Sequence, residues 1–373
     1  MNFLRIRELA RKEFLQLFRD KKNRPVLFVM PIIQLLLFGY VVNYDIKLIR
    51  VALFDQDHTS QSRNLVETLT GSRIFQIDHH VSDEKELTEL LLMRKADLAI
   101  NIPPGFSATI RKGESAAIQI LVDGSMSNMA SIRIMYLMQI LNRYNQNLIK
   151  EIYSVRMDYA RIDARLRAWY NPNLDSQNFF VPGIVAFLIM LISLILTSMA
   201  IIKEKEAGTM EQLIVTPIKG RELILGKTIP YIIIAIGQMA VVTTFAKFWF
   251  DVPFRGSIFL LFVASCIFLL STLGTGLFIS TIAATQQQAM MTTFFFMLPF
   301  FMLSGFVFPI RNMPVFVQWI TYFNPMRYFL VIIRGIFLKG VGIDVLWPQY
   351  LAMVGLGVVV FSLATLRLKK RLD

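Results

Sequence analysis

Apolar and polar stretches alternate along this chain on a coarse scale. Six apolar runs approach or exceed the length of about 20 residues that a helix needs to cross the hydrocarbon core of a bilayer. They occupy residues 25–44, 179–202, 228–250, 258–282, 289–308 and 346–366. The pattern therefore predicts six transmembrane helices, one before and five after a long stretch of mixed polarity.

Residues 45–178 form that stretch and predict a water-soluble domain of α/β or α+β class, inserted after the first transmembrane helix. Short β-prone runs bounded by turn residues indicate the strands, and apolar residues at helical spacing indicate the helices. We expect strands at 51–54, 74–77, 98–102 and 118–122, and helices at 60–69 and 83–94. One or two long helices should follow between 127 and 169.

Residues 1–24 predict an amphipathic basic helix. Its apolar side chains recur at helical spacing: Ile6, Leu9, Ala10, Phe14, Leu17 and Phe18. Such a helix can lie in the headgroup layer, held by apolar area and by attraction to anionic lipid. The run that follows is longer than the apolar part of a signal peptide and lacks an Ala-x-Ala-like site, so it predicts an uncleaved membrane anchor.

Two polar interruptions divide the second half of the chain. Residues 203–227 carry five basic side chains and cannot lie in lipid, which predicts a cytoplasmic loop. Residues 309–342 are too rich in polar residues and turns for a plain span, and predict short re-entrant helices at the external interface. Aromatic and basic residues there are expected at headgroup level: Trp319, Tyr322, Arg327, Tyr328 and Arg334.

The distribution of charge sets the orientation. The chain is 55% apolar and 17% charged, with a formal charge of +13. Residues 45–175 hold 16 basic and 16 acidic residues, so the excess of 23 basic over 10 acidic lies outside them. Basic residues confined to segments that flank apolar spans place those segments in the cytoplasm and argue against nucleic-acid binding. Both termini are therefore predicted to be cytoplasmic.

Candidate chemistry within the chain is sparse. Residues 220–228 resemble a phosphate-binding loop, but five residues separate the glycines where the motif requires four. The three histidines, His58, His79 and His80, match no metal-ligand spacing, and the single cysteine, Cys266, cannot form an internal disulfide. With no acidic residue inside the spans and no catalytic set, we expect neither an enzyme nor a bound metal or cofactor. If the chain takes part in a process that requires energy, a partner protein must supply that energy.

A resemblance lies in the segment Glu204–Pro217 and in the stretch Asn324–Tyr328 with Arg334–Gly335. Together with the layout of a basic helix, one span, a large domain and five spans, they resemble the ABC type-2 exporter permeases, in particular the bacterial multidrug type. The resemblance covers essentially the whole chain and implies the helical membrane fold of that family with six transmembrane helices.

The resemblance implies that residues 203–227 form a coupling loop that packs into a groove of a separate ATPase subunit. The residues expected to make this contact are Glu204, Glu206, Gly208, Thr209, Met210, Glu211, Gln212, Leu213 and Pro217. The external segment would contribute Asn324, Pro325, Arg327 and Arg334. ATP and Mg²⁺ would bind the ATPase and not this chain.

The implied assembly holds two ATPase subunits and a second, identical or related permease in the bacterial cytoplasmic (inner) membrane, with an extracytoplasmic adaptor protein as a further partner. The expected activity is export of hydrophobic or amphipathic compounds, including drugs, between the two permeases. Two alternatives stay open at this point: an exporter of ions or glycans, and a membrane sensor or scaffold without transport.

Overall fold

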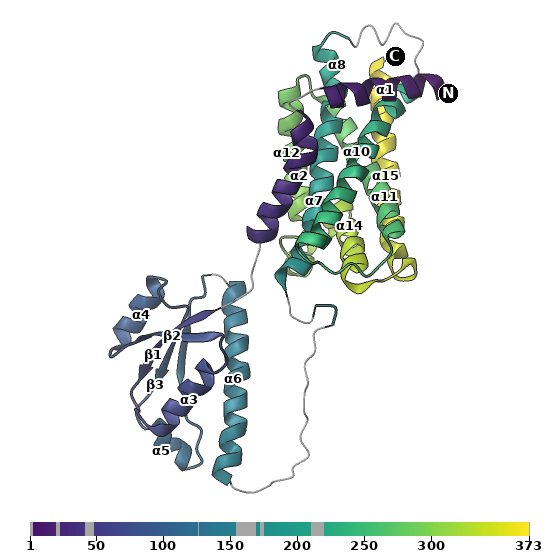
Figure 1. The fold of residues 1–373 in the computed structure, drawn as a ribbon. Helices are drawn as coiled ribbons and strands as arrows, with labels where there is room; N and C mark the ends of the chain where they lie inside the picture. The colour runs from purple at the N-terminus through teal and green to yellow at the C-terminus, as the bar shows by residue number, and fades with distance from the viewer. Residues whose placement is uncertain are drawn as a thin grey trace. The chain divides into compact units, whose positions relative to one another are not determined.

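The computed structural model describes residues 3–19, 23–41, 48–125, 127–153, 169–171, 175–209 and 220–372 (Figure 1). The chain divides into two compact units. The larger unit joins Met1–Asn43 to Arg167–Asp373, and the smaller unit is Tyr44–Leu166. The apolar runs lie in the larger unit, and the stretch of mixed polarity supplies the smaller one.

The larger unit is helical. Its long helices are α1 (Phe3–Arg19), α2 (Asn23–Val41), α7 (Ser176–Met199), α10 (Gly220–Trp249), α11 (Ile258–Ile282), α12 (Gln286–Met302) and α15 (Ile343–Leu372), and α8 (Ile202–Glu206) is short. Within the described residues, four segments are long and apolar enough to cross a membrane: Ser176–Glu206, Glu222–Trp249, Ile258–Ile282 and Ile343–Arg367. Helices lie in all six predicted runs, but residues 303–308 of the fifth run form turns and bends, and residues 42–44 of the first lie outside the described residues. The apolar part of α2 (Phe28–Val41) and the 17 residues of α12 are shorter than the other four. Six complete spans therefore stay a prediction.

Helix α7 forms the centre of this unit because it is apolar on all sides. It contacts α2, α10, α11, α12 and the later helix α14 (Pro325–Arg334). Its side chains Val181, Val185, Leu188 and Ile189 are fully buried in the main apolar core. The other helices of the unit are arranged around it.

Small residues of α11 let its neighbours approach closely: Ser271, Gly274, Thr275 and Gly276. A Cβ atom on Gly276 would lie 2.7 Å from Cβ of Thr197 in α7, and one on Gly274 would lie 2.9 Å from the backbone nitrogen of Phe361 in α15. All four residues are buried. Their role in the structure is helix packing.

Between α12 and α15 the chain forms short helices, as predicted. They are the 3₁₀ turn η1 (Ile310–Asn312), α13 (Val315–Thr321), α14 and a π-helical turn η2 (Gly335–Lys339). Helix α14 buries Met326, Phe329 and Ile333 against α7, α11 and α15. This segment is therefore part of the core of the larger unit.

The smaller unit is a mixed α/β domain. In chain order it contains β1 (Ile49–Asp55), α3 (Ser60–Thr70), β2 (Phe75–His80), α4 (Glu84–Leu92), β3 (Leu98–Ile102), α5 (Phe106–Arg111), β4 (Gln119–Val122) and α6 (Ser127–Tyr153). The strand order is β2-β1-β3-β4, with β1 parallel to both neighbours and β3 antiparallel to β4. The four strands and first two helices confirm the sequence prediction, which missed α5 after the Pro103–Gly105 turn.

Helices cover both faces of this sheet. Residues of α3, α5 and α6, including Leu65, Ile110 and Leu137, bury one face. Leu87 and Leu90 of α4 pack on the other face against Ala52 and Ala99. The alternation of strands and helices in the sequence therefore builds a sheet between two helical layers.

Asp57 ties the loop after β1 to the start of α5. Its carboxylate accepts hydrogen bonds from Oγ1 of Thr59 at 2.5 Å and from the backbone N–H groups of Gly105 at 2.9 Å and Ser107 at 3.1 Å. Partial burial acts to raise the pKa of Asp57, but these bonds outweigh it and lower the pKa below the ordinary value of 3.8. The charged form is therefore the one that the fold stabilises.

The substitution Asp57→Asn is expected to loosen the start of α5. At neutral pH, hydrogen exchange of peptides covering residues 103–111 should be faster in the variant than in the intact protein. Because the pKa is lower in the folded state, the contribution of Asp57 is complete above pH 3.8 and is lost as the pH falls through the folded value. The difference between variant and parent should therefore shrink on acidification; a constant difference would contradict this assignment.

Gly276→Leu is expected to destabilise the larger unit, because the side chain would meet the backbone and side chains of α7. Overpacking of this kind costs about 1–3 kcal/mol or more. Thermal unfolding of the full chain in detergent measures the loss. Gly237→Leu is the matched control, since a Cβ at Gly237 of α10 meets no atom within 4 Å. Equal melting temperatures for the two variants would disprove the packing role.

Candidate functional site

A buried group of charged side chains joins three helices at one end of the larger unit. Figure 1 shows α1, α8 and the last turns of α15 at this end. We call the group the ion-pair cluster; it consists of Lys12 and Glu13 of α1, Glu204 of α8, and Lys227 and Tyr231 of α10. Its α1 members lie 192 to 218 positions before their partners in α8 and α10.

Lys227 is the centre of the ion-pair cluster. Its side chain is only 2% exposed, and its Nζ atom lies 2.5 Å from Oε1 of Glu13 and 3.1 Å from Oε1 of Glu204. The same atom donates a hydrogen bond of 3.0 Å to the carbonyl oxygen of Ala200, just before α8. The ammonium group therefore donates two hydrogen bonds, to Glu13 and Ala200, and forms ion pairs with two carboxylates.

The other members complete the cluster. Nζ of Lys12 lies 3.0 Å from Oε1 of Glu204, and the hydroxyl of Tyr231 donates to Oε2 of Glu13 at 2.9 Å. Two carboxylates thus balance two ammonium groups in a site that is largely closed to water. Removing one partner of a buried ion pair typically costs about 3–5 kcal/mol, since the other charge stays buried without compensation.

Close backbone contact supports these ion pairs. A Cβ on Gly226 of α10 would lie 2.6 Å from Cβ of Leu9, so α1 can reach α10 only because this position has no side chain. Beside it, Nη1 of Arg5 lies 3.7 Å from Oε2 of Glu222, which is also buried. Helix α1 is therefore held to α10 by apolar contact and by charge.

This end of the molecule differs from the sequence prediction at the start of α10. Residues 220–227 were expected in a loop, but α10 already begins at Gly220 and buries Lys227. Helix α1 buries its stripe Ile6, Leu9, Glu13 and Leu17 within the protein, and its position in the headgroup layer stays a prediction. Glu13 among apolar residues at helical spacing was the signal that could have revealed a partner inside the protein.

The predicted coupling residues fall into two groups. Met210, Glu211, Gln212, Leu213 and Pro217 lie outside the described residues. Glu204, Glu206, Gly208 and Thr209 are described. Oε1 of Glu204 pairs with Lys12 and Lys227, and the expected contact of Glu204 with a partner protein stays a prediction.

The remaining three residues shape the end of α8. Glu206 accepts hydrogen bonds from the backbone N–H of Gln286 at 2.8 Å and from its side-chain amide, which ties α8 to the start of α12. Gly208 has a φ of +69°, where residues with a Cβ are strained, and the N–H of Thr209 donates to the carbonyl of Glu204 at 3.0 Å. The chain thus leaves α8 through a glycine-dependent turn directly into residues 210–219.

The predicted residues of the external segment have local roles. Asn324 caps α14 by accepting from the N–H of Met326 at 3.0 Å, and its amide donates to the carbonyl of Phe300 at 2.7 Å. Pro325 occupies the first turn of α14, and Arg327 bonds Thr321. Arg334 stacks on the ring of Phe179 at 3.7 Å and donates to its carbonyl at 3.3 Å, so it contacts α7.

Two other sequence features can be placed. Residues Gly220–Thr228, which resemble a phosphate-binding loop, are the first turns of α10, so their N–H groups do not form a loop around an anion. Within the described part of the chain, no group of three or more His, Cys, Asp or Glu side chains could hold a metal ion.

Comparison with known proteins gives consistent matches. Residues 25–366 match the family described as "ABC-2 family transporter protein". The chain is 35% identical to the "Probable multidrug ABC transporter permease YbhS" of Escherichia coli (strain K12), with 100% of this chain and 99% of the relative covered. It is 33% identical to YbhR, a protein of the same description, over 92% and 93% of the two chains. The "Inner membrane transport permease YhhJ" is 28% identical over 94% and 95%.

We predict that Lys227→Met destabilises the protein by about 3–5 kcal/mol, because Glu13 stays buried without a cation. In the double variant Lys227→Met, Glu13→Gln, Glu204 keeps Lys12, so most of the stability should return. Chemical unfolding of the full chain in detergent measures both. Lys247→Met, an exposed position of the same helix, should change stability by no more than about 0.5 kcal/mol. Additive losses in the double variant would show that no coupled cluster exists.

Proposed function

The chain belongs to the ABC-2 family of transporter proteins, and on this premise we propose that it is the permease subunit of an ATP-binding cassette exporter. The observation that carries the proposal is the similarity, over the full length of both chains, to a probable multidrug permease. Its relatives are named as permeases or transporters, which favours transport over the sensor or scaffold alternative.

The energy for export is proposed to come from a separate ATPase subunit, present in two copies. The residues that most resemble a phosphate-binding loop are helical and enter the membrane-spanning part of α10. ATP and Mg²⁺ would therefore bind the partner and not this chain. The permease would then use the movement of its ATPase partner to open the export path to one side of the membrane or to the other.

The segment between α8 and α10, residues 207–219, is proposed as the contact with the ATPase, through Met210, Glu211, Gln212, Leu213 and Pro217 in particular. Support comes from what flanks these residues. Helix α8 leads into the segment and α10 leads out of it, and both are fixed to each other and to α1 by the ion-pair cluster. A force applied to residues 210–219 would act on α1, α8 and α10 at once. It would also reach the core of the unit, because α7 and α10 supply many of its residues.

A second permease is proposed to complete the export path. Helix α12 exposes large apolar side chains, among them Phe295 at 73% and Leu298 at 53%. Such a face suits contact with lipid or with another permease. Between two copies, the aromatic and methionine side chains of α12 would favour hydrophobic or amphipathic cargo, in keeping with the multidrug designation of the relatives.

The proposed location is the bacterial inner membrane, with α1 and the end of α15 in the cytoplasm. These helices and α8 lie at the same end of the larger unit (Figure 1), and they carry 11 of its 24 Lys and Arg residues. The smaller unit, which follows α2, would then lie on the external side. An extracytoplasmic adaptor is proposed as its partner.

Affinity purification of the detergent-solubilised protein from its native membrane tests the proposal. The intact protein should bring down an ATPase, and the preparation should hydrolyse ATP in a vanadate-sensitive manner. The variant Glu211→Ala, Leu213→Asp should lose most of the ATPase, because it removes one charge and one apolar anchor from the contact. Glu114→Ala, an exposed position of the smaller unit, is the control and should retain it.

The two parts of the proposal fail separately in this experiment. If the intact protein brings down no ATPase, the exporter function is contradicted. If the intact protein and the Glu211→Ala, Leu213→Asp variant bring down equal amounts, the exporter stands but the coupling contact lies elsewhere.

A further inference from the structure

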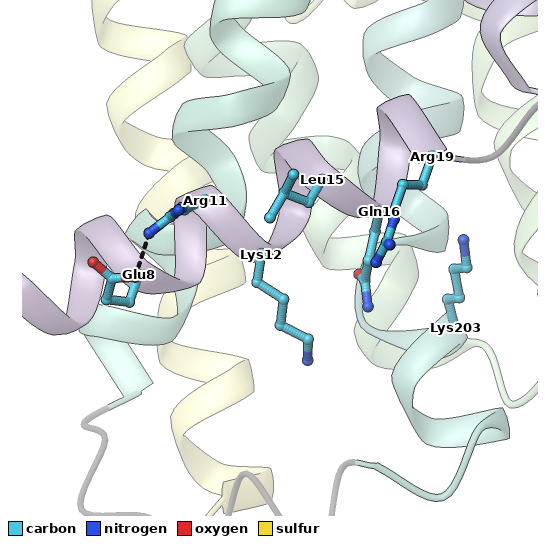
Figure 2. Close-up of a pocket in the computed structure, with 7 residues that line it drawn as sticks. All are labelled: Glu8, Arg11, Lys12, Leu15, Gln16, Arg19 and Lys203. Atoms are coloured by element: carbon cyan, nitrogen blue, oxygen red, sulfur yellow. Dashed lines mark ion pairs between the residues drawn. The ribbon is translucent and has the colours of Figure 1, made fainter.

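A basic groove lies between α1 and α8, on the side of α1 away from its buried stripe. Its volume is about 790 Å³, and its lining residues are Glu8, Arg11, Lys12, Leu15, Gln16, Arg19 and Lys203. Six of these recur at helical spacing along α1, and Lys203 faces them from α8 (Figure 2). Four cations and one carboxylate give the groove a strong positive charge.

The charge of the groove is divided unevenly between its two ends. At one end, Arg11 lies 3.8 Å from Glu8, and Lys12 is engaged by Glu204. At the other end Gln16, Arg19 and Lys203 lie together (Figure 2). Among the described residues, neither Arg19 nor Lys203 has an ion-pair partner. Two cations and an amide donor thus line one space, and the described residues that line it place no anion between them.

One apolar side chain lines the same groove: Leu15, which is 53% exposed. Figure 1 shows α1 running across the end of α10 and not along it, the orientation of a helix at a membrane surface. A ligand of this groove should therefore combine an anionic group with apolar chains.

We infer that the groove binds the headgroup phosphate of an anionic phospholipid through Gln16, Arg19 and Lys203, with an acyl chain against Leu15. Charge complementarity selects an anion, and the exposed leucine selects a lipid over a free phosphate. Lys203 lies on α8, at the entrance to residues 210–219, and Arg19 lies near the end of α1. The bound phosphate bridges these two helices, close to Lys12, which lines the groove and also belongs to the ion-pair cluster.

Native mass spectrometry of the purified full chain in detergent tests this inference, with phosphatidylglycerol and phosphatidylcholine as probes. The intact protein should bind phosphatidylglycerol more tightly than phosphatidylcholine. Each of Arg19→Gln and Lys203→Gln should weaken phosphatidylglycerol binding about fivefold, since a basic residue near an anionic headgroup contributes about that factor. The double variant should lose about 25-fold.

The control removes equal charge elsewhere. Lys205 is an exposed lysine of α8 that does not line the groove, and Arg311 is an exposed arginine of η1. The variant Lys205→Gln, Arg311→Gln should bind phosphatidylglycerol as the intact protein does. Circular dichroism of each variant establishes that the helices remain folded.

Three outcomes would overturn the inference. Equal binding of the two lipids by the intact protein would exclude selection of an anion, and equal loss in the control variant would exclude this groove. Displacement of phosphatidylglycerol by millimolar inorganic phosphate would make the groove a site for free phosphate. The test contains no ATPase, so its result is independent of the permease proposal.

Discussion

A buried ammonium group must find anions within the protein, and this requirement organises one end of the larger unit. Lys227 lies within the second turn of a helix that goes on to form an apolar span, where water cannot neutralise its charge. Glu13 can supply one carboxylate only if α1 lies against α10, and Gly226 makes that contact possible. Glu204 supplies the other only if α8 folds back beside them. The positions of three helices thus follow from one charge.

Four of the six spans and the strands of the smaller unit were predictable because their signals are local. Length and continuous apolarity define a membrane helix, and alternation with turn residues defines the strands of the smaller unit. The start of α10 was misplaced by eight residues for the same reason: Arg221, Glu222 and Lys227 are polar, and a local rule assigns polar residues to water. What makes a helix possible there is ion pairing with α1, which a window of neighbouring residues does not contain.

The candidate site shows the same division. The segment Glu204–Pro217 was recognisable as a motif, but the motif does not reveal which of its carboxylates point outward. Glu204 pairs with lysines of α1 and α10 and Glu206 with Gln286, although the two are neighbours on a single turn. The same holds for Arg334, which the sequence placed among headgroups and which stacks on Phe179 of α7. Long-range partners decide such assignments, and a single sequence carries no direct record of them.

The sequence distance between Glu13 and Lys227 also has a consequence for biosynthesis. The two residues are 214 positions apart, so at about 5–20 residues per second the ribosome needs roughly 10–40 s to supply the lysine after the glutamate. During that time α1 has no α10 on which to pack, and Glu13 must remain in contact with water. The ion-pair cluster can therefore form only late in translation, after α10 has been synthesised. A chain that stops before Lys227 exposes an acidic residue on an apolar helix face, a feature by which an unfinished membrane protein differs from a complete one.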